Sequence, residues 1–277
     1  MEGTKVDVAA NSRIQAKWDG MAKGYEESAK GKSNVQSLVT CAAMTKAYNA
    51  KTIIEVGCGT GLTSLLLARS FLPSNKGVLV SCDLAPQMIH LLKANFDNQT
   101  NDFSQIPGNK SLIDTETNYC ELNADQTLAN KVDLQSIISS QGDFRKLVYG
   151  CIANNEILPF GDNLFDSYLA NLSLNLVDNR VNMLREAYRV LAPGGAACFT
   201  VWGPREKCSF FTVVYDVLAK YYPQEKLQAF LGMFGAFKCY EEKDQVIEEM
   251  KQAGFCGIKV WEQAQSVGFK DGTDFME

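Results

Sequence analysis

A short apolar run that ends in three closely spaced glycines constrains this chain more than any other feature. Residues 52–56 are rich in β-branched side chains, which predicts a buried strand. Gly57, Gly59 and Gly61 follow, and the apolar stretch at 62–70 predicts a helix. Glycine serves where the backbone takes a positive φ or lets a ligand approach closely, and a helix start offers unpaired N–H groups. The segment therefore predicts a strand–turn–helix unit that binds a ligand.

Strand and helix patterns alternate after this unit, which indicates an α/β fold with a mostly parallel sheet and helices on both faces. Pro193-Gly194-Gly195 predicts a turn before the last of these strands. The further strands are expected at 78–82, 146–153, 167–170 and 196–202, and the helices at 87–96 and 181–191.

Four regions describe the organisation. Residues 1–50 are expected to form an N-terminal helical lid or extension, and residues 51–202 the ligand-binding core. Within the core, residues 98–145 are polar and long for a connection, which favours a solvated insertion. The aromatic-rich residues 203–240 predict a helical substrate cover. Residues 241–277 are expected to complete the core with a helix and a long strand over 257–269, and the sequence ends as a helix would begin, which suggests a shortened topology or a truncated chain.

Composition narrows the function classes. The 277 residues carry 27 Lys+Arg against 32 Asp+Glu, a net charge of -5, which argues against a nucleic-acid surface. No apolar run approaches the roughly 18 residues of a membrane span, and the N-terminus lacks a signal-peptide pattern. The nine scattered cysteines favour reduced thiols in a cytoplasmic protein, without a metal site. The single histidine, His90, excludes mechanisms that need several imidazoles.

The spacing of glycines and acceptors indicates the kind of ligand. The turn reads G-x-G-x-G after Glu55, whereas a dinucleotide fingerprint requires G-x-G-x-x-G. A carboxylate beside the turn disfavours a pyrophosphate and favours a ligand with an ammonium group. Asp83 ends the next strand, where a carboxylate accepts ribose hydroxyls. Asn154 follows a further strand and offers an acceptor for an adenine amino group. Together these acceptors predict a nucleoside site.

At these residues the chain resembles the class I S-adenosylmethionine-dependent methyltransferases. The resemblance is strongest to the small-molecule branch that includes ubiquinone/menaquinone-biosynthesis-like enzymes, methyltransferase type 11. It implies a Rossmann-like class I methyltransferase fold, S-adenosyl-L-methionine as cofactor, S-adenosyl-L-homocysteine as product, and a small-molecule substrate. The motifs that carry the resemblance are Glu55–Gly61, Asp83–Met88, Leu158–Asp166 and the Arg185–Gly195 helix and turn.

The resemblance also implies positions for the cofactor. The three glycines and Cys58 would pass beneath the methionine and ribose, and Glu55 would lie near the amino group. Asp83 would hold the ribose, with Leu84 and Met88 beside the adenine. Asn154 stands where the family usually has Asp, with Asn155 after it, and Tyr25 falls where relatives place a lid tyrosine. Asn171 and Leu172, after the fourth strand of the family pattern, would contact the amino-acid end.

The catalytic residues stay open. Candidates to face the methyl group are Tyr25, Asn171, Asn175 and Trp202, and none has the spacing of a catalytic constellation. The sequence therefore predicts no general base. Three functions remain: transfer of a methyl group to O, N or C of a small molecule with an apolar or aromatic part; a cofactor-binding partner subunit without turnover; and, disfavoured by the glycine spacing, a nicotinamide-dependent oxidoreductase.

Overall fold

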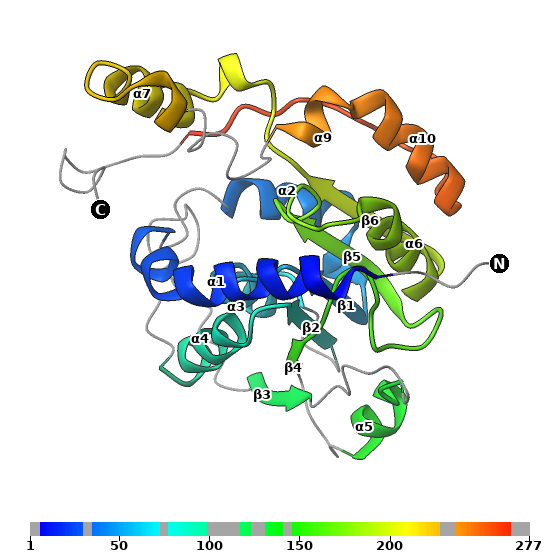
Figure 1. Ribbon diagram of the computed structural model, residues 1–277. Coiled ribbons are helices and arrows are strands. Elements are labelled where there is room, and N and C mark those ends of the chain that lie inside the picture. The colour runs from blue at the N-terminus through cyan, green and yellow to red at the C-terminus, as the bar shows by residue number, and fades with distance from the viewer. Residues whose placement is uncertain are drawn as a thin grey trace.

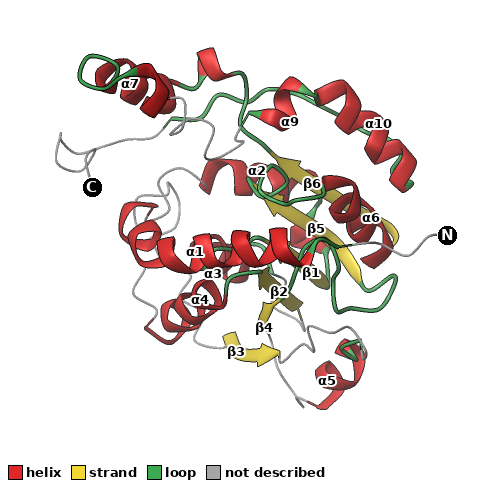
Figure 2. Ribbon diagram, in the orientation of Figure 1, coloured by secondary structure: helices red, strands yellow, loops and turns green. Residues whose placement is uncertain are grey.

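The structure, a computed structural model, describes residues 6–29, 35–72, 77–98, 117–122, 131–140, 146–227 and 237–266. A central sheet runs through the molecule with helices on both of its sides (Figures 1 and 2). In the described residues six strands pair in the order β3-β4-β2-β1-β5-β6, and every pair is parallel. The predicted α/β class is confirmed. The strands are β1 (Thr52–Val56), β2 (Gly77–Asp83), β3 (Thr117–Leu122), β4 (Lys146–Ile152), β5 (Phe165–Asn171) and β6 (Leu191–Thr200).

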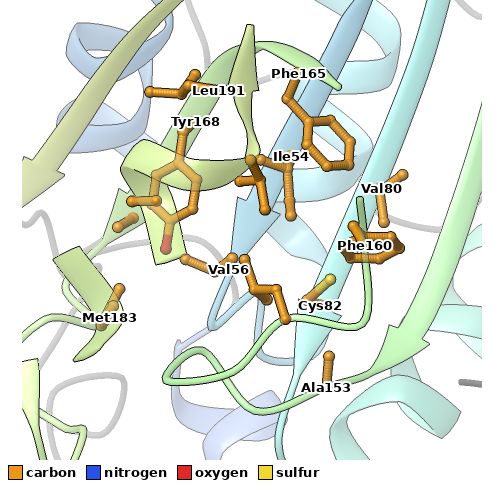
Figure 3. Close-up of a cluster of buried hydrophobic side chains, with 14 of the residues drawn as sticks. Ile54, Val56, Val80, Cys82, Ala153, Phe160, Phe165, Tyr168, Met183 and Leu191 are labelled. Carbon is orange, nitrogen blue, oxygen red and sulfur yellow. The ribbon is translucent and has the colours of Figure 1, made fainter. Parts of the chain in front are cut away.

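Alternation along the strands divides the core into two apolar layers. Neighbouring residues of a strand point to opposite faces, so Ile53 and Ile54, both fully buried, belong to different clusters. Figure 3 shows the layer around Ile54, which includes Val80, Phe160 and Tyr168. Both faces of the inner strands are covered, which explains why these strands read as continuous apolar runs rather than alternating ones.

Each face carries its own helices. Apolar side chains of α2 (Val35–Met44), α3 (Leu62–Ser70) and α4 (Pro86–Asn98) pack with Ile53 and Leu79. On the other face, α5 (Leu134–Ser140), α6 (Arg180–Val190) and α10 (Lys243–Ala253) contribute to the layer around Ile54. The long helix α1 (Val8–Ala29) packs on α4, as Figure 1 shows. Helices on both faces and at the N-terminus are therefore confirmed.

The loop after β4 is fixed to α6 by one arginine. The Arg189 guanidinium donates to the carbonyls of Leu158 and Phe160 at 3.1 and 2.7 Å, and to Asp162 at 2.7 Å. Glu186, one turn earlier, accepts from Arg189 and from the backbone N–H of Leu158. The loop between β4 and β5 thereby gains partners for its carbonyls, which explains why this irregular segment is held in place.

The periphery differs from the expected elements at two places. Within the segment expected as a solvated insertion, β3 joins the sheet in parallel register with β4 and extends its edge. Pairing of backbone groups decided this, although the segment lacks a strong apolar pattern. The second correction concerns the long strand expected over 257–269, because residues 257–266 form no strand. The remainder of that range lies outside the described residues.

The region expected as a helical cover contains η3 (Arg205–Lys207), α7 (Ser209–Leu218) and α9 (Lys238–Glu241), and 228–236 lie outside the described residues. A short turn of helix, η1 (Ala47–Asn49), precedes β1. The turn expected at residues 193–195 lies inside β6, where the pairing with β5 is irregular. No helix of the described residues is both long and apolar enough to span a membrane.

An arginine fixes α10 against α6. Arg180 Nε lies 2.6 Å from Glu249 Oε2 and its Nη2 lies 3.1 Å from Oε1, a bidentate pair. A third bond joins Arg180 to Glu242 at the start of α10. The side chains of Arg180 and Glu249 are only 12% and 11% exposed, so water screens this pair weakly.

We expect Arg180→Ala to destabilise the protein by about 2 kcal/mol, because it leaves the buried Glu249 carboxylate without its positive partner. Arg180→Lys should recover part of this loss, since lysine cannot form the bidentate fork. Urea unfolding measures both. Arg185, exposed on the same helix, is the matched control, and Arg185→Ala should change stability by less than about 0.5 kcal/mol. Equal losses at the two positions would contradict the assignment.

Candidate functional site

The glycine turn takes the conformation that its sequence predicts. Gly57, Gly59 and Gly61 have φ values of 65, 56 and 83°, in the region that favours glycine. The turn joins the carboxyl end of β1 to the start of α3, with Gly61 at the helix N-cap. A β-carbon on Gly61 would lie 2.7 Å from Leu92 Cγ of α4. Gly61 therefore allows α4 to approach the turn closely.

Asp83 connects this turn to the next strand–helix junction. Its carboxylate accepts from the backbone N–H of Gly59 and from that of Ala85, both at 2.9 Å. The second bond closes a local Asx turn directly before α4, which starts at Pro86. Burial raises the pKa of Asp83 to about 6, although the two backbone bonds oppose this shift. One side chain thus sets the relative position of two loops at neighbouring strand ends.

Glu55 lies beneath the turn instead of on its surface. It is 1% exposed, and its Oε2 accepts from the Ser64 and Ser81 hydroxyls at 2.5 and 3.3 Å. Its other oxygen, Oε1, has no hydrogen-bond partner. Burial raises the pKa of Glu55 to about 7, while the hydroxyl donors act against this rise. The sequence predicted Glu55 at the ligand, but Ser64 and Ser81 were not singled out.

Helix α1 packs over the turn. The Tyr25 ring lies 3.6 Å from the position of a β-carbon on Gly59, and Trp18 meets Tyr25 edge-on at 5.9 Å. Ala22 and Trp18 pack with Met88 of α4. Polar contacts join the same elements: Asp19 accepts from the backbone N–H of Gln87 at 2.9 Å. The predicted lid position of Tyr25 therefore coincides with a helix that contacts the glycine turn.

One amide holds the far end of α1 to the turn. Asn95 Nδ2 of α4 donates to Glu26 Oε1 and to the carbonyl of Thr60, both at 2.9 Å. Thr60 is the turn residue before Gly61, so α1, α4 and the turn meet at a single side chain. Asn95 was not predicted from the sequence, because an amide inside an amphipathic helix has no distinctive pattern.

The segment after β4 crosses the strand ends towards β1. Asn154 Oδ1 accepts from the backbone N–H of Glu156 at 2.9 Å, which uses the predicted adenine acceptor in a local turn. The next residue, Asn155, is 8% exposed, and its Oδ1 has no partner. Its amide nitrogen lies 3.7 Å from the position of a β-carbon on Gly57. Asn155 therefore lies beside the glycine turn, although it follows β4 and the turn follows β1.

The segment after β5 also meets the turn. Asn171 Oδ1 accepts from the Thr200 hydroxyl at 2.7 Å, and the Leu172 N–H donates to Thr200 Oγ1 at 3.0 Å. Leu172 has a φ of 53°, which is uncommon for a residue with a side chain. Ser173 follows, 4% exposed, with its Cβ 2.6 Å from the position of a β-carbon on Gly57. Leu172 was predicted at the site from its position after the strand, whereas Ser173 was not predicted.

The other candidates are placed as follows. Met88 is buried at the α1–α4 contact. Leu84 lies between Asp83 and Ala85, whose backbone N–H donates to the Asp83 carboxylate. Cys58 is buried, with its thiol 3.6 Å from the Gly59 carbonyl. His90 is exposed on α4. Among the described residues the cysteines are free thiols, and no cluster of potential metal ligands occurs. Asn175 and Trp202 follow the ends of β5 and β6, where ligands of open α/β sheets bind.

A parallel sheet, a glycine turn after its first strand and a carboxylate at the neighbouring strand end define the Rossmann-like class of α/β protein. Residues 54–199, more than half of the chain, match the family model described as "Methyltransferase domain". The chain belongs to this methyltransferase family.

Curated relatives agree with this assignment over part of their length. The chain is 32% identical over 122 residues to the ubiquinone/menaquinone biosynthesis C-methyltransferase UbiE of Geotalea daltonii, covering 43% of this chain and 47% of that protein. It is 27% identical over 132 residues to the malonyl-[acyl-carrier protein] O-methyltransferase of Herminiimonas arsenicoxydans, covering 47% and 46%. The chain thus spans less than half the length of these relatives.

Solved structures with a similar fold are more distant. The CcbJ methyltransferase from Streptomyces caelestis matches at 14% identity with a TM-score of 0.46, covering 70% of this chain and 61% of that one. The [4+2]-cyclase SpnF matches at 17% identity with a TM-score of 0.45, covering 68% and 58%. The family assignment rests on the sequence match and not on these structures.

A matched pair of glycine substitutions tests the close approach of α4. Gly61 and Gly194 share a φ of 83°, but no atom lies within 4 Å of a β-carbon on Gly194. Both alanine variants should lose about 1 kcal/mol from backbone strain. Gly61→Ala should lose about 1–3 kcal/mol more, because its methyl group would overlap Leu92. Urea unfolding of the two variants measures the difference, and equal stabilities would contradict the packing described.

Glu55 should make stability depend on pH. Its pKa is higher in the folded than in the unfolded protein, so the folded state binds more protons between about pH 4.5 and 7. Its contribution to stability therefore decreases as pH rises through this window, by up to about 3 kcal/mol. Glu55→Gln should flatten the dependence and be the more stable protein at pH 8.

Urea unfolding of both proteins at several pH values between 5 and 8 measures this effect. The comparison isolates Glu55, because Asp83 titrates in both. Parallel curves for the two proteins would show that Glu55 does not carry the shift.

Proposed function

We propose that the protein is an S-adenosylmethionine-dependent methyltransferase that acts on a small molecule. The observation that supports this most directly is the Asp83 carboxylate, bound to the Gly59 N–H at the carboxyl ends of β1 and β2. Membership of the methyltransferase family gives the reaction class. The relatives named above methylate carbon in one case and oxygen in the other, so the atom methylated here is a separate question.

The residues present fit a sulfonium nucleoside. The absence of a side chain at Gly59 leaves room above the turn, with the Tyr25 ring 3.6 Å from the position of a β-carbon there. Asp83 has carboxylate lone pairs beyond its two backbone bonds, which suit ribose hydroxyls. Asn155, after β4, and Ser173, after β5, add unpartnered oxygens at the same edge of the sheet. A site of this composition supplies acceptors for a ligand that is rich in donors.

In this proposal each element has a defined task. Asp83 orients the ribose, and its bond to Gly59 holds the turn in the binding conformation. Met88 and Leu84, on the β2–α4 side, provide apolar contact for the adenine. Tyr25 and Trp18 of α1 exclude water from above the turn. Helix α1 contributes the cover, and α4 contributes the surface on which that cover rests.

When bound, the cofactor would supply a methyl group that is already activated by the positive sulfur. The chain's own residues therefore contribute mainly position and exclusion of water. The backbone of Gly57 and the polar residues after β4 and β5 lie where the acceptor must approach. Among the described residues we assign no general base, because a neutral nucleophile can attack before it loses its proton.

Calorimetric titration with S-adenosylmethionine, S-adenosylhomocysteine and NAD tests the proposal. We expect saturable binding of both sulfur nucleosides at about micromolar Kd and none of NAD. Asp83→Asn keeps an acceptor but removes the charge, and should weaken S-adenosylhomocysteine binding about tenfold. Asp97→Asn, at an exposed position of α4, is the control and should leave the Kd unchanged.

Methyl transfer from labelled cofactor into a metabolite extract then separates an enzyme from a cofactor-binding subunit. Binding without transfer would favour the latter. Failure of both sulfur nucleosides to bind would overturn the proposal.

A further inference from the structure

The clearest unexplained feature is a pair of buried oxygens with no hydrogen-bond partner. Asn155 Oδ1 and Ser173 Oγ are both unpartnered, in side chains that are 8% and 4% exposed. Burying an acceptor without a partner costs about 1–3 kcal/mol. Natural proteins rarely keep such groups unless a ligand or water completes them. Two of them at one place indicate a binding function.

The two side chains meet at Gly57. From the position of a β-carbon on Gly57, Ser173 Oγ lies 3.3 Å away and Asn155 Nδ2 lies 3.7 Å away. The side chains of Asn155 and Ser173 therefore lie beside the same residue of the turn. Any residue other than glycine at position 57 would overlap Ser173. Ser173 therefore takes the space that a side chain at position 57 would need, and it packs against the turn from the end of β5.

The location within the sheet points to the reacting end of a ligand. The chain moves from β1 to β2 in one direction, and β5 joins β1 on the opposite side. The crevice between the ends of β1 and β5 is therefore the topological switch point, where open α/β sheets bind ligands. Gly57 follows β1 and Ser173 follows β5, so the pair lines this crevice. Asp83 lies at the end of β2, and Tyr25 lies over Gly59. Both are on the side of the turn proposed to hold the nucleoside.

The charge of the pair indicates which donor it accepts. Amide and hydroxyl oxygens are neutral acceptors, and a buried cation without a counter-charge is much more costly than a neutral donor. The pair therefore accepts N–H or O–H donors and supplies no charge of its own. A hydrogen bond from the acceptor's own hydrogen would also direct its lone pair towards the methyl group.

We infer that Asn155 and Ser173 bind the methyl-accepting group itself, and that this group is a hydroxyl or an amine that carries hydrogen. The inference rests on the proposed function and defines its substrate class. In the reaction, the lone pair of oxygen or nitrogen forms the bond to the methyl carbon while the carbon–sulfur pair returns to sulfur. The proton that the product then loses passes to water.

Two cofactor analogues test the inference without a known substrate. S-adenosylhomocysteine has no group at the position of the transferred methyl, whereas sinefungin carries an amine there. Calorimetry gives the Kd of both for the wild type, Asn155→Ala, Ser173→Ala and the double variant. We expect sinefungin binding to weaken about fivefold per lost hydrogen bond and S-adenosylhomocysteine binding to change less than about twofold. Asn155→Asp should instead tighten sinefungin alone, because it adds a charge that the amine can pair with.

Two control measurements separate binding from structure. Asn98→Ala and Ser136→Ala, at exposed positions of α4 and α5, should change neither Kd. Ser173→Ala should keep the Tm of the wild type or raise it, since the hydroxyl has no partner to lose. A clear drop in Tm would assign Ser173 a structural role and overturn the inference.

The remaining outcomes are also decisive. Equal weakening of both analogues would show that the pair holds a part common to them, such as the amino-acid end, and would overturn the inference. If neither Kd changed in any variant, the inference would also be overturned, while the proposed function would stay intact. If the wild type did not bind S-adenosylhomocysteine at all, the proposed function would be overturned, and the inference with it.

Discussion

The Asp83 carboxylate is the interaction on which the arrangement of the site depends. It bonds the glycine turn after β1 and the start of α4 after β2, two loops that belong to different strand–helix units. Strand pairing fixes the two strand ends relative to one another, but it leaves the loops free to adopt several conformations. A buried carboxylate with two backbone donors removes that freedom, at the cost of a raised pKa.

A second constraint acts through the absence of side chains. At Gly61 the missing side chain lets α4 approach through Leu92, and at Gly57 it lets Ser173 approach from the end of β5. The turn is therefore a junction of three strand ends rather than a loop that happens to be glycine-rich. This explains why the residues that surround it come from segments more than 100 positions apart in the chain, such as Gly57 and Ser173.

The sequence predicted the central fold well, because the β-branched runs, the glycine turn and the amphipathic helices are local patterns. It failed where structure depends on distant pairing. The edge strand β3 has a weak pattern and is stabilised by β4, while residues 257–266 have strand-like composition but no strand partner. Within the site, Asp83 and Tyr25 were singled out by position. Ser64, Ser81, Asn95 and Ser173 were not, because a small polar residue becomes informative only when its neighbours in space are known.

Helix α1 has a consequence for the kinetics of ligand exchange. The contacts of α1 described above are with α4 and the glycine turn, and they involve no strand pairing. The helix can therefore undock as a unit while the sheet stays intact. For the proposed function, entry of the cofactor and departure of its product would share one barrier, set by a small apolar contact and a few hydrogen bonds. In such an arrangement, opening of the cover would limit how fast the ligand exchanges.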